Sequence, residues 1–279
     1  MAFALFEQAR ERVLLAAHRG ASAGNIPCNT LGAYDIALRQ GADIIEADVD
    51  CSSDGVLFIF HPGMEPAHLG LTGRISSLTA EQIRALRFVN QDLTPTPWGL
   101  ATLDELLEHL KGRCVVNLDK FWTHPQAIAE TVRRHGMTEQ VVIKAYVKEQ
   151  QLLDVERFAP DIPFMPIFGE NDVVHEQLLR RPIRYVGSEV LFTSDTAPVA
   201  SEAYIERMHK DGKLLWCNAI VYDHRAVLSA GHSDDASLLD DPAKGWGWLA
   251  DRGFDILQTD WLLAARQYLD QTGKLRRAR

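Results

Sequence analysis

Short apolar runs alternate with longer amphipathic stretches along most of the 279 residues. The runs that we expect to be strands are residues 13–17, 43–49, 56–61, 114–118, 141–145, 162–167, 184–187, 214–217 and 256–258. Helical stretches lie between most of them, at residues 30–40, 125–135, 148–158, 200–210 and 246–252. Alternation of this kind predicts a parallel sheet with crossover helices, and near-continuous apolar strands predict a sheet that is covered on both faces.

About eight parallel strands fit this pattern, which favours an α/β fold, a single (β/α)8 TIM barrel, over other arrangements. We expect one domain over residues 1–279, because no linker or change of composition divides the chain. The run at 56–61 is an extra element, joined to the second strand by the turn SSDG at 52–55. Residues 62–101 interrupt the alternation and predict a short insertion with one helix at 79–86. An open doubly wound sheet is the alternative, but no GxGxxG or GxxxxGK[ST] loop supports it.

The charge and the termini limit the classes of partner. A formal charge of −9 argues against a nucleic-acid-binding surface. No run of 18 apolar residues occurs, so we expect no stable membrane insertion. The four cysteines lack metal-binding spacing and are expected to be free thiols, which suit a reducing compartment. Charged residues interrupt what would be the core of a signal peptide, so we expect a cytoplasmic protein. The oligomeric state stays open.

Two acidic residues on one predicted strand are the first candidates for chemistry. Glu46 and Asp48 are two positions apart, so both side chains point to the same face of the strand. Adjacent carboxylates repel each other unless a cation lies between them, and a hard divalent cation such as Mg²⁺ or Ca²⁺ takes oxygen ligands. The alternative is a strand end that leaves the sheet with both carboxylates solvated.

Two histidines end apolar runs nearby. His18 and His61 would supply one acid and one base, and Arg19 offers a planar guanidinium that suits phosphate. For either histidine alone, a hydrogen bond to a loop is the simpler interpretation. Their common position beside a carboxylate pair favours a phosphodiester-cleaving site.

The order of these motifs resembles the glycerophosphodiester phosphodiesterase family, whose members are barrels related to phosphatidylinositol-specific phospholipase C. The similarity rests on AHRG at 17–20, PCNT at 27–30, GADIIEADV at 41–49 and the strand ending at His61. It continues in TGRISSLTAEQIRAL, ATLDELLEHLKG, VVNLDK, LLWCN and GFDILQTD.

The resemblance implies a metal-dependent phosphoric diester hydrolase of lipid and glycerol metabolism. Such an enzyme cleaves glycerophosphodiesters to glycerol 3-phosphate and an alcohol. By this resemblance His18 and His61 are the acid–base pair and Arg19 contacts phosphate. The metal ligands, for Mg²⁺ or Ca²⁺, are Glu46, Asp48 and Asp119.

Several positions depart from the family pattern. Cys28 replaces a glutamate near the metal, and Pro62 replaces a carboxylate that could orient His61. The family's lysine falls at Phe121, and we expect Lys120 on the opposite face of the strand. Lys144 is therefore a second candidate for contact with the phosphate; a solvated strand end is its alternative.

Later residues complete the candidate pocket. Trp216 is expected to bind substrate as a pocket wall, with Asn218 as a hydrogen-bonding group, although a buried tryptophan filling the barrel is nearly as plausible. Glu189 pairs with Lys144 or contacts substrate, and Asp260 is expected to cap the last helix.

Three other functions stay open. The first is a phospholipase D-like enzyme on lysolipids or sphingolipids, which needs an apolar surface for acyl chains. The second is a metal-dependent aldolase or lyase, which has no evident use for two histidines beside an arginine. The third is a barrel with impaired catalysis that acts as a binding protein, and Cys28 and Pro62 are the main arguments for it.

Overall fold

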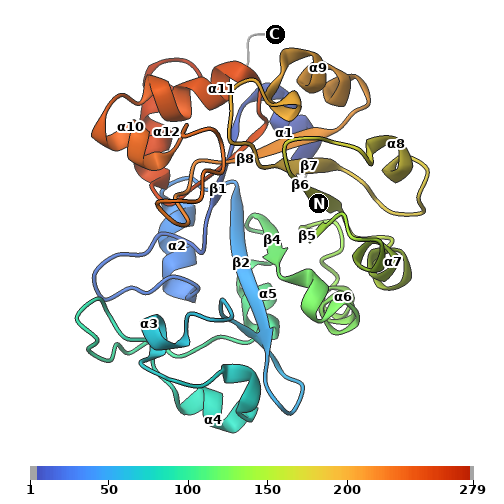
Figure 1. Ribbon diagram of the computed structural model, residues 1–279. Helices are drawn as coiled ribbons and strands as arrows, with labels where there is room; N and C mark the ends of the chain where they lie inside the picture. The colour runs from blue at the N-terminus through green and yellow to red at the C-terminus, as the bar shows by residue number, and fades with distance from the viewer. Residues whose placement is uncertain (1–4, 277–279) are drawn as a thin grey trace.

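A sheet of nine strands closes on itself in the computed structural model, which describes residues 5–276 (Figure 1). The first four and last three residues of the predicted domain 1–279 lie outside the described residues. The barrel strands are β1 (Leu14–Ala17), β2 (Ile44–Cys51), β4 (Val115–Asp119), β5 (Val141–Tyr146), β6 (Phe164–Phe168), β7 (Gly187–Val190), β8 (Leu214–Asn218) and β9 (Ile256–Thr259). All pair in parallel, and pairing of β1 with β2 and β9 closes the barrel. The predicted TIM barrel is confirmed.

Helices surround the strands (Figure 1). In chain order they are α2 (Leu31–Arg39), α5 (Leu103–Leu110), α6 (Pro125–Arg134), α7 (Glu149–Phe158), α8 (His175–Leu178), α9 (Glu202–Lys210), α10 (Asp234–Leu239), α11 (Trp248–Arg252) and α12 (Leu262–Gln271). Local signals fix several starts: the side chain of Thr30 caps α2, and Thr102 and Glu105 form a capping box at α5. None of the helices within residues 5–276 has the length and hydrophobicity that a membrane crossing requires.

Alternate residues of each strand enter different cores, as the two-residue period of a strand requires. Leu15 and Ala17 of β1 pack in the cluster between the barrel and its helices, whereas Leu14 and Ala16 pack in a second cluster inside the barrel. Leu5 of α1 (Leu5–Glu11) joins this inner cluster, so α1 closes the N-terminal end of the barrel. The interior of the barrel is therefore apolar at the N-terminal ends of the strands. The polar side chains of the pocket come from further along the strands, toward their C-terminal ends.

The predicted insertion forms a small lobe beside β2. The antiparallel strand β3 (Leu57–Ile59) pairs with the last residues of β2, and α3 (Glu65–Leu69) and α4 (Ala80–Ala85) follow it (Figure 1). The lobe has its own core of Phe58, Phe60, Ile75, Ile83, Phe88 and Leu100. It thus holds the turn after His61 against the C-terminal end of the barrel.

One strand was placed wrongly from the sequence. The run at 184–187 was expected to be a strand, but β7 spans Gly187–Val190. Ser188 and Glu189 of this strand are polar, yet both are buried. Their burial is possible because Ser188 has a hydrogen-bond partner and Glu189 an ion-pair partner inside the protein. Their polarity hid the strand from a search for apolar runs.

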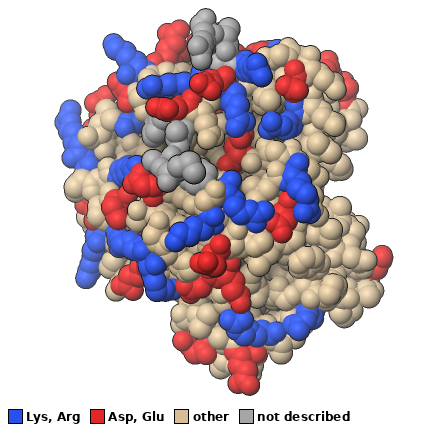
Figure 2. Space-filling view, turned by 180° about the vertical axis from the view of Figure 1, so that it is seen from behind, with Lys and Arg blue, Asp and Glu red and all other residues tan. Residues whose placement is uncertain are grey.

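The surface carries mixed charge on the face behind Figure 1. Figure 2 shows Lys and Arg interspersed with Asp and Glu over that face. Exposed charged residues of neighbouring elements form ion pairs, such as Arg134 with Asp104 and Arg184 with Glu139. Exposed pairs of this kind contribute little to stability, typically about 0–1 kcal/mol each.

Candidate active site

A pocket of about 270 Å³ opens at the C-terminal ends of the barrel strands, the end at which barrel enzymes carry their sites. Polar side chains from β1, β2, β4 and the turn after β3 line one side of it, and apolar side chains from β6 to β8 line the other. The charged and imidazole groups in its lining are His18, Arg19, Glu46, His61, Asp119, Lys120, Lys144 and Glu189.

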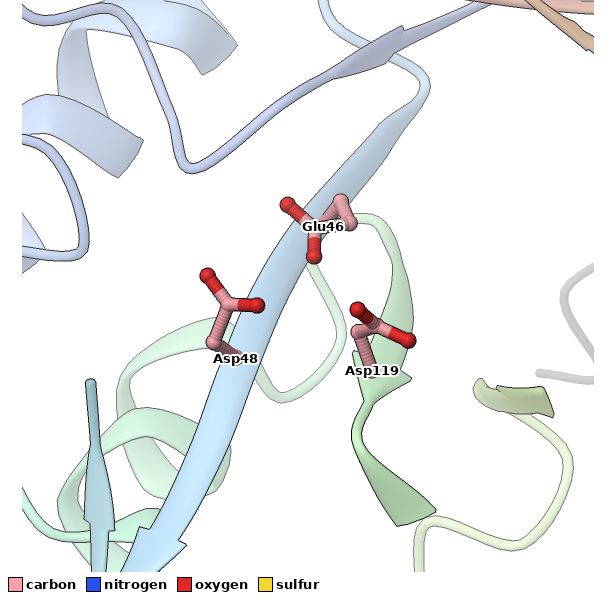
Figure 3. Close-up of side chains that lie close together, drawn as sticks. All are labelled: Glu46, Asp48 and Asp119. Atoms are coloured by element: carbon pink, nitrogen blue, oxygen red, sulfur yellow. The ribbon is translucent and has the colours of Figure 1, made fainter. Parts of the chain in front are cut away.

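Three carboxylates converge on this side of the pocket. Glu46 and Asp48 project from the same face of β2 toward Asp119 at the end of β4 (Figure 3). One oxygen from each lies within 4.8 Å of the others, and Asp48 pairs in register with Asp119. Burial raises the pKa of Glu46 to about 7, and the charge of Asp48 adds to the shift.

The three carboxylates fit a hard metal ion. They offer only oxygen atoms, and Oδ1 of Asp48 is buried without a hydrogen-bond partner in the described part of the chain. An unpaired buried carboxylate oxygen is costly unless a cation satisfies it. Glu46, Asp48 and Asp119 could therefore hold a metal ion.

Arg19 lies against this acidic cluster and lines the same pocket. Its backbone adopts a φ of +56°, and its amide donates to Oε2 of Glu46 at 2.9 Å. Its Nε lies 2.9 Å from Oδ2 of Asp48. A residue other than glycine adopts such a backbone only where its surroundings stabilise it. The hydrogen bond from the Arg19 amide to Glu46 is one such stabilising contact.

The prediction that Lys120 lies on the opposite face of its strand is wrong. The strand ends at Asp119, and Lys120 takes a left-handed backbone with φ of +62°. Its Nζ then lies 2.6 Å from Oδ2 of Asp119 and 3.8 Å from Oδ1 of Asp48. The alternation of faces applies only inside a strand, so it gave the wrong side for a residue that has already left it.

The side chain of His18 is oriented by Asp260, which the sequence predicts to be a helix cap. Its Nδ1 lies 2.8 Å from Oδ1 of Asp260, and Asp260 does not cap the last helix, whose N-cap is Trp261 without a side-chain bond. Burial lowers the pKa of His18, but the hydrogen bond to Asp260 and the charge of Glu46 outweigh burial, and the pKa is raised. Asp260 therefore stabilises the protonated imidazole.

His61 has weaker support. Its Nε2 lies 4.0 Å from Oδ1 of Asp48, and its Nδ1 is buried without a partner among the described residues. Burial lowers the pKa of His61, and Asp48 offsets only part of this effect. With Pro62 as the next residue, no carboxylate follows His61 to orient the ring.

Lys144 of β5 and Glu189 of β7 form a buried ion pair inside the barrel. Nζ of Lys144 lies 2.7 Å from Oε2 of Glu189, so the predicted pairing is confirmed. The same Nζ lies 3.2 Å from the centre of the Trp216 ring. Trp216 is fully buried and does not line the pocket, so the prediction that it contacts the substrate is corrected: it fills the barrel beneath Lys144.

Cys28 contacts the insertion that follows β3. Its Sγ lies 3.8 Å from Nδ1 of His68, and burial raises the pKa of the thiol to about 12. The thiol is therefore uncharged at neutral pH and supplies no anionic contact to the site, as the replacement of a glutamate implies.

The remaining wall is apolar and aromatic. Trp122 and Tyr146 pack with ring centres 5.2 Å apart, and the Tyr222 ring lies 6.3 Å from that of His61. Apolar side chains complete this wall: Ile167, Leu191, Ile220 and Leu228. Sequence reasoning identified none of these residues, nor Asn117 on the floor, because only the closed barrel places them around one pocket.

Comparisons with known protein sequences match parts of the chain. A family model described as a domain of unknown function matches residues 164–269. A probable glycerophosphodiester phosphodiesterase 1 of Mycobacterium tuberculosis is 43% identical over 72 residues, which is 26% of this chain and 26% of that protein. Over this stretch the chain is similar to a protein of the glycerophosphodiester phosphodiesterase family. The aligned region thus spans about a quarter of the curated relative.

Solved structures of phosphodiesterases share the whole barrel. A glycerophosphoryl diester phosphodiesterase from Parabacteroides distasonis superposes with a TM-score of 0.79 at 18% identity, covering 99% of this chain and 96% of that one. A phosphodiesterase from Oleispira antarctica, solved in complex with the product sn-glycerol-3-phosphate, gives 0.69 at 18% identity, with 93% and 97% covered. At such identities the likeness shows the fold.

Proposed function

We propose that the chain hydrolyses glycerophosphodiesters to glycerol 3-phosphate and an alcohol. The observation that carries the proposal is the meeting of His18, His61, Arg19 and the acidic cluster in one pocket. A relative named as a probable glycerophosphodiester phosphodiesterase and a similar structure in complex with sn-glycerol-3-phosphate support this substrate class. Residues 1–279 would act as one catalytic domain, because one barrel carries every group of the site.

Glu46, Asp48 and Asp119 would hold the metal, for which we propose Mg²⁺ or Ca²⁺ because all three offer carboxylate oxygens. A divalent cation at this position supplies positive charge to the non-bridging oxygens of the phosphate. Arg19 and Lys120 stand beside the same carboxylates and would contact those oxygens as well. In the transition state these fixed charges stabilise the charge that develops on the phosphate.

His18 would act as the base. Its Nδ1 is engaged by Asp260, which leaves Nε2 for the pocket, and Asp260 stabilises the imidazolium that forms when His18 accepts a proton. His61 would then protonate the departing alcohol from the other side of the acidic cluster. The attacking oxygen is that of water or that of the substrate's own glycerol hydroxyl, which gives a cyclic phosphate first.

The apolar wall favours a second candidate, a phospholipase D-like activity on lysolipids. Ile167, Leu191, Ile220 and Leu228 line the pocket, and an acyl chain needs such a surface. Choline release from glycerophosphocholine and from lysophosphatidylcholine separates the two candidates. Faster release from the lysolipid would favour the second.

Product analysis tests the proposal directly. With glycerophosphocholine as substrate, phosphorus NMR should show glycerol 3-phosphate as the phosphorylated product and no phosphocholine. Phosphocholine as the product would mean that the other ester bond is cleaved, and the proposed orientation of the substrate would be wrong.

A further inference from the structure

Two buried amide oxygens on the pocket floor lack partners. Oδ1 of Asn117 and Oδ1 of Asn218 have no hydrogen bond among the described residues, although these asparagines are 0% and 2% exposed. Both residues line the pocket, one from β4 and the other from β8. Buried polar atoms without partners are rare in folded proteins, so two in one pocket indicate a ligand.

The chemistry of their neighbours fixes which end of each amide is free. Nδ2 of Asn117 donates to the carbonyl oxygen of Val142 at 3.1 Å, and Nδ2 of Asn218 donates to Oε1 of Glu189 at 2.6 Å. Both partners are acceptors, so the NH₂ group must face them in each case. The free atoms are therefore oxygens, which accept hydrogen bonds from a donor and repel a phosphate oxygen.

The charge of Lys144 decides whether the donor to these oxygens is a cation or a neutral hydroxyl group. Lys144 is 2% exposed, lines the same pocket and holds its Nζ 2.7 Å from Glu189, which also accepts from Asn218. A cationic ligand at the asparagine oxygens would be repelled by the ammonium group of Lys144. The charge of such a ligand would also lack a counterion, because Glu189 is already paired with Lys144. A neutral hydroxyl group meets no such penalty.

Depth in the barrel separates this floor from the phosphate groups. Asn117 pairs in register with Glu46, two residues before Asp119 pairs with Asp48. The side of the pocket open to solvent carries Tyr146 and Tyr222, which are 42% and 62% exposed. A substrate whose phosphate lies at the acidic cluster can therefore place one arm on the floor and the other toward the aromatic rim.

We infer that Asn117 and Asn218 bind the hydroxyl groups of the substrate's glycerol arm and determine specificity for it. The inference rests on the proposed function for the identity of that arm. The glycerol lies inward, and the alcohol arm lies outward against the apolar wall. The enzyme should thus select strongly for a hydroxylated arm and weakly among alcohols, because a site built to bind a hydroxyl leaves its own polar groups unpaired with an analogue that lacks it.

Binding measurements test the inference without requiring turnover. Isothermal titration of the full chain in Mg²⁺ would compare glycerol 3-phosphate with n-propyl phosphate, which has the same phosphate and carbon chain without hydroxyls. The wild type should bind glycerol 3-phosphate at least about tenfold more tightly, on the scale of one or more hydrogen bonds to buried acceptors. Equal affinities in the wild type would overturn the inference.

Variants then assign the effect to the two amides. Asn117→Leu and Asn218→Leu keep the approximate volume but lose the acceptor, and each should reduce the preference for glycerol 3-phosphate while n-propyl phosphate binds as before. Asn171→Leu, at an exposed position, is the matched control and should keep the preference. An undiminished preference in both floor variants would contradict the assignment.

Hydrolysis separates this inference from the proposed function. If the wild type cleaves glycerophosphocholine and n-propyl phosphocholine equally fast, the floor is not the specificity element but the phosphodiesterase activity stands. If it prefers glycerol 3-phosphate in binding yet cleaves no diester, the floor stands and the proposed function fails.

Discussion

Nδ1 of His18 lies 2.8 Å from Oδ1 of Asp260, a residue 242 positions later in the chain. Closure of the barrel by β1 and β9 brings the two together. The backbone amide of Asp260 in turn donates to Oδ2 of Asp234 at 2.8 Å, and Oδ1 of Asp234 accepts from Trp246 and Thr259. Asp234 thereby holds the backbone of Asp260 in place. Asp260 can orient the imidazole in the way that a carboxylate orients the histidine of a catalytic triad.

Replacing Asp260 by Asn should change both the rate and the pH profile. Since the hydrogen bond to Asp260 raises the pKa of His18, its loss should lower that pKa. A base must be unprotonated to act, so the acidic limb of the profile of kcat/KM should move to lower pH. The turnover number should fall by about 10² or more, because Asn also favours the wrong tautomer.

The pH profile also provides the control for that variant. Asp240→Asn, at an exposed position in an ion pair with Lys244, should leave both limbs unchanged. An Asp260→Asn enzyme with a reduced rate and an unmoved acidic limb would mean that Asp260 has only a structural role.

Removing either imidazole should disable turnover. His18→Ala and His61→Ala should each lower kcat by about 10² or more, the usual contribution of one acid or base. His135→Ala is a suitable control, because His135 lies at the end of α6, away from the pocket, with its Nε2 2.7 Å from Oδ1 of Asp104. Steady-state kinetics at the optimal pH provide the measurement, and full activity in either site variant would contradict the assignment.

Lys120→Met should affect metal and substrate in opposite directions. The variant removes a positive charge 2.6 Å from Asp119, so Mg²⁺ should bind more tightly, by about tenfold on the scale of charges a few ångströms apart. The value of kcat/KM should fall, because the proposed contact of Lys120 with the phosphate is lost. Titration calorimetry and kinetics measure the two effects, with Lys210→Met on the exposed end of α9 as control. Unchanged metal affinity would exclude Lys120 from the metal cluster.

Breaking the buried ion pair should cost stability. Lys144→Met leaves the Glu189 carboxylate uncompensated in the barrel, and loss of one partner of a buried pair costs about 3–5 kcal/mol. Adding Glu189→Leu should restore most of the free energy of unfolding, because the unpaired charge is gone. Urea denaturation of the two single variants and the double variant measures this coupling, and additive effects would mean that the pair is not buried in solution.

Periodicity was sufficient for the architecture of the chain and insufficient for part of its site. Apolar runs locate strands whose interior residues are apolar at the N-terminal end, such as β1 and β9. They fail at β7, where Glu189 points to Lys144 inside the barrel and the neighbouring Ser188, on the opposite face, is hydrogen-bonded to Tyr185. A strand that serves a polar pocket is thus the hardest to recognise.

The site residues that were missed or misplaced have two causes. Asp260 looked like a helix cap because the sequence does not state that β9 returns to lie beside β1. Lys120 was misplaced because its left-handed backbone begins where the strand ends. Asn117 has an unpaired oxygen in a pocket that only the closed barrel forms. The positions of Asp260 and Asn117 thus depend on barrel closure, and that of Lys120 on where its strand ends, and neither is contained in a pattern of apolar residues.

The most direct test of the account is the release of glycerol 3-phosphate from glycerophosphocholine by the purified chain, with and without divalent metal. We expect turnover with Mg²⁺ or Ca²⁺, none after chelation, and recovery when metal is restored. Glu46→Ala should remain folded and inactive at the same metal concentration, because one of the three carboxylates is lost. Release that persists at the same rate after chelation, or in Glu46→Ala, would contradict the account.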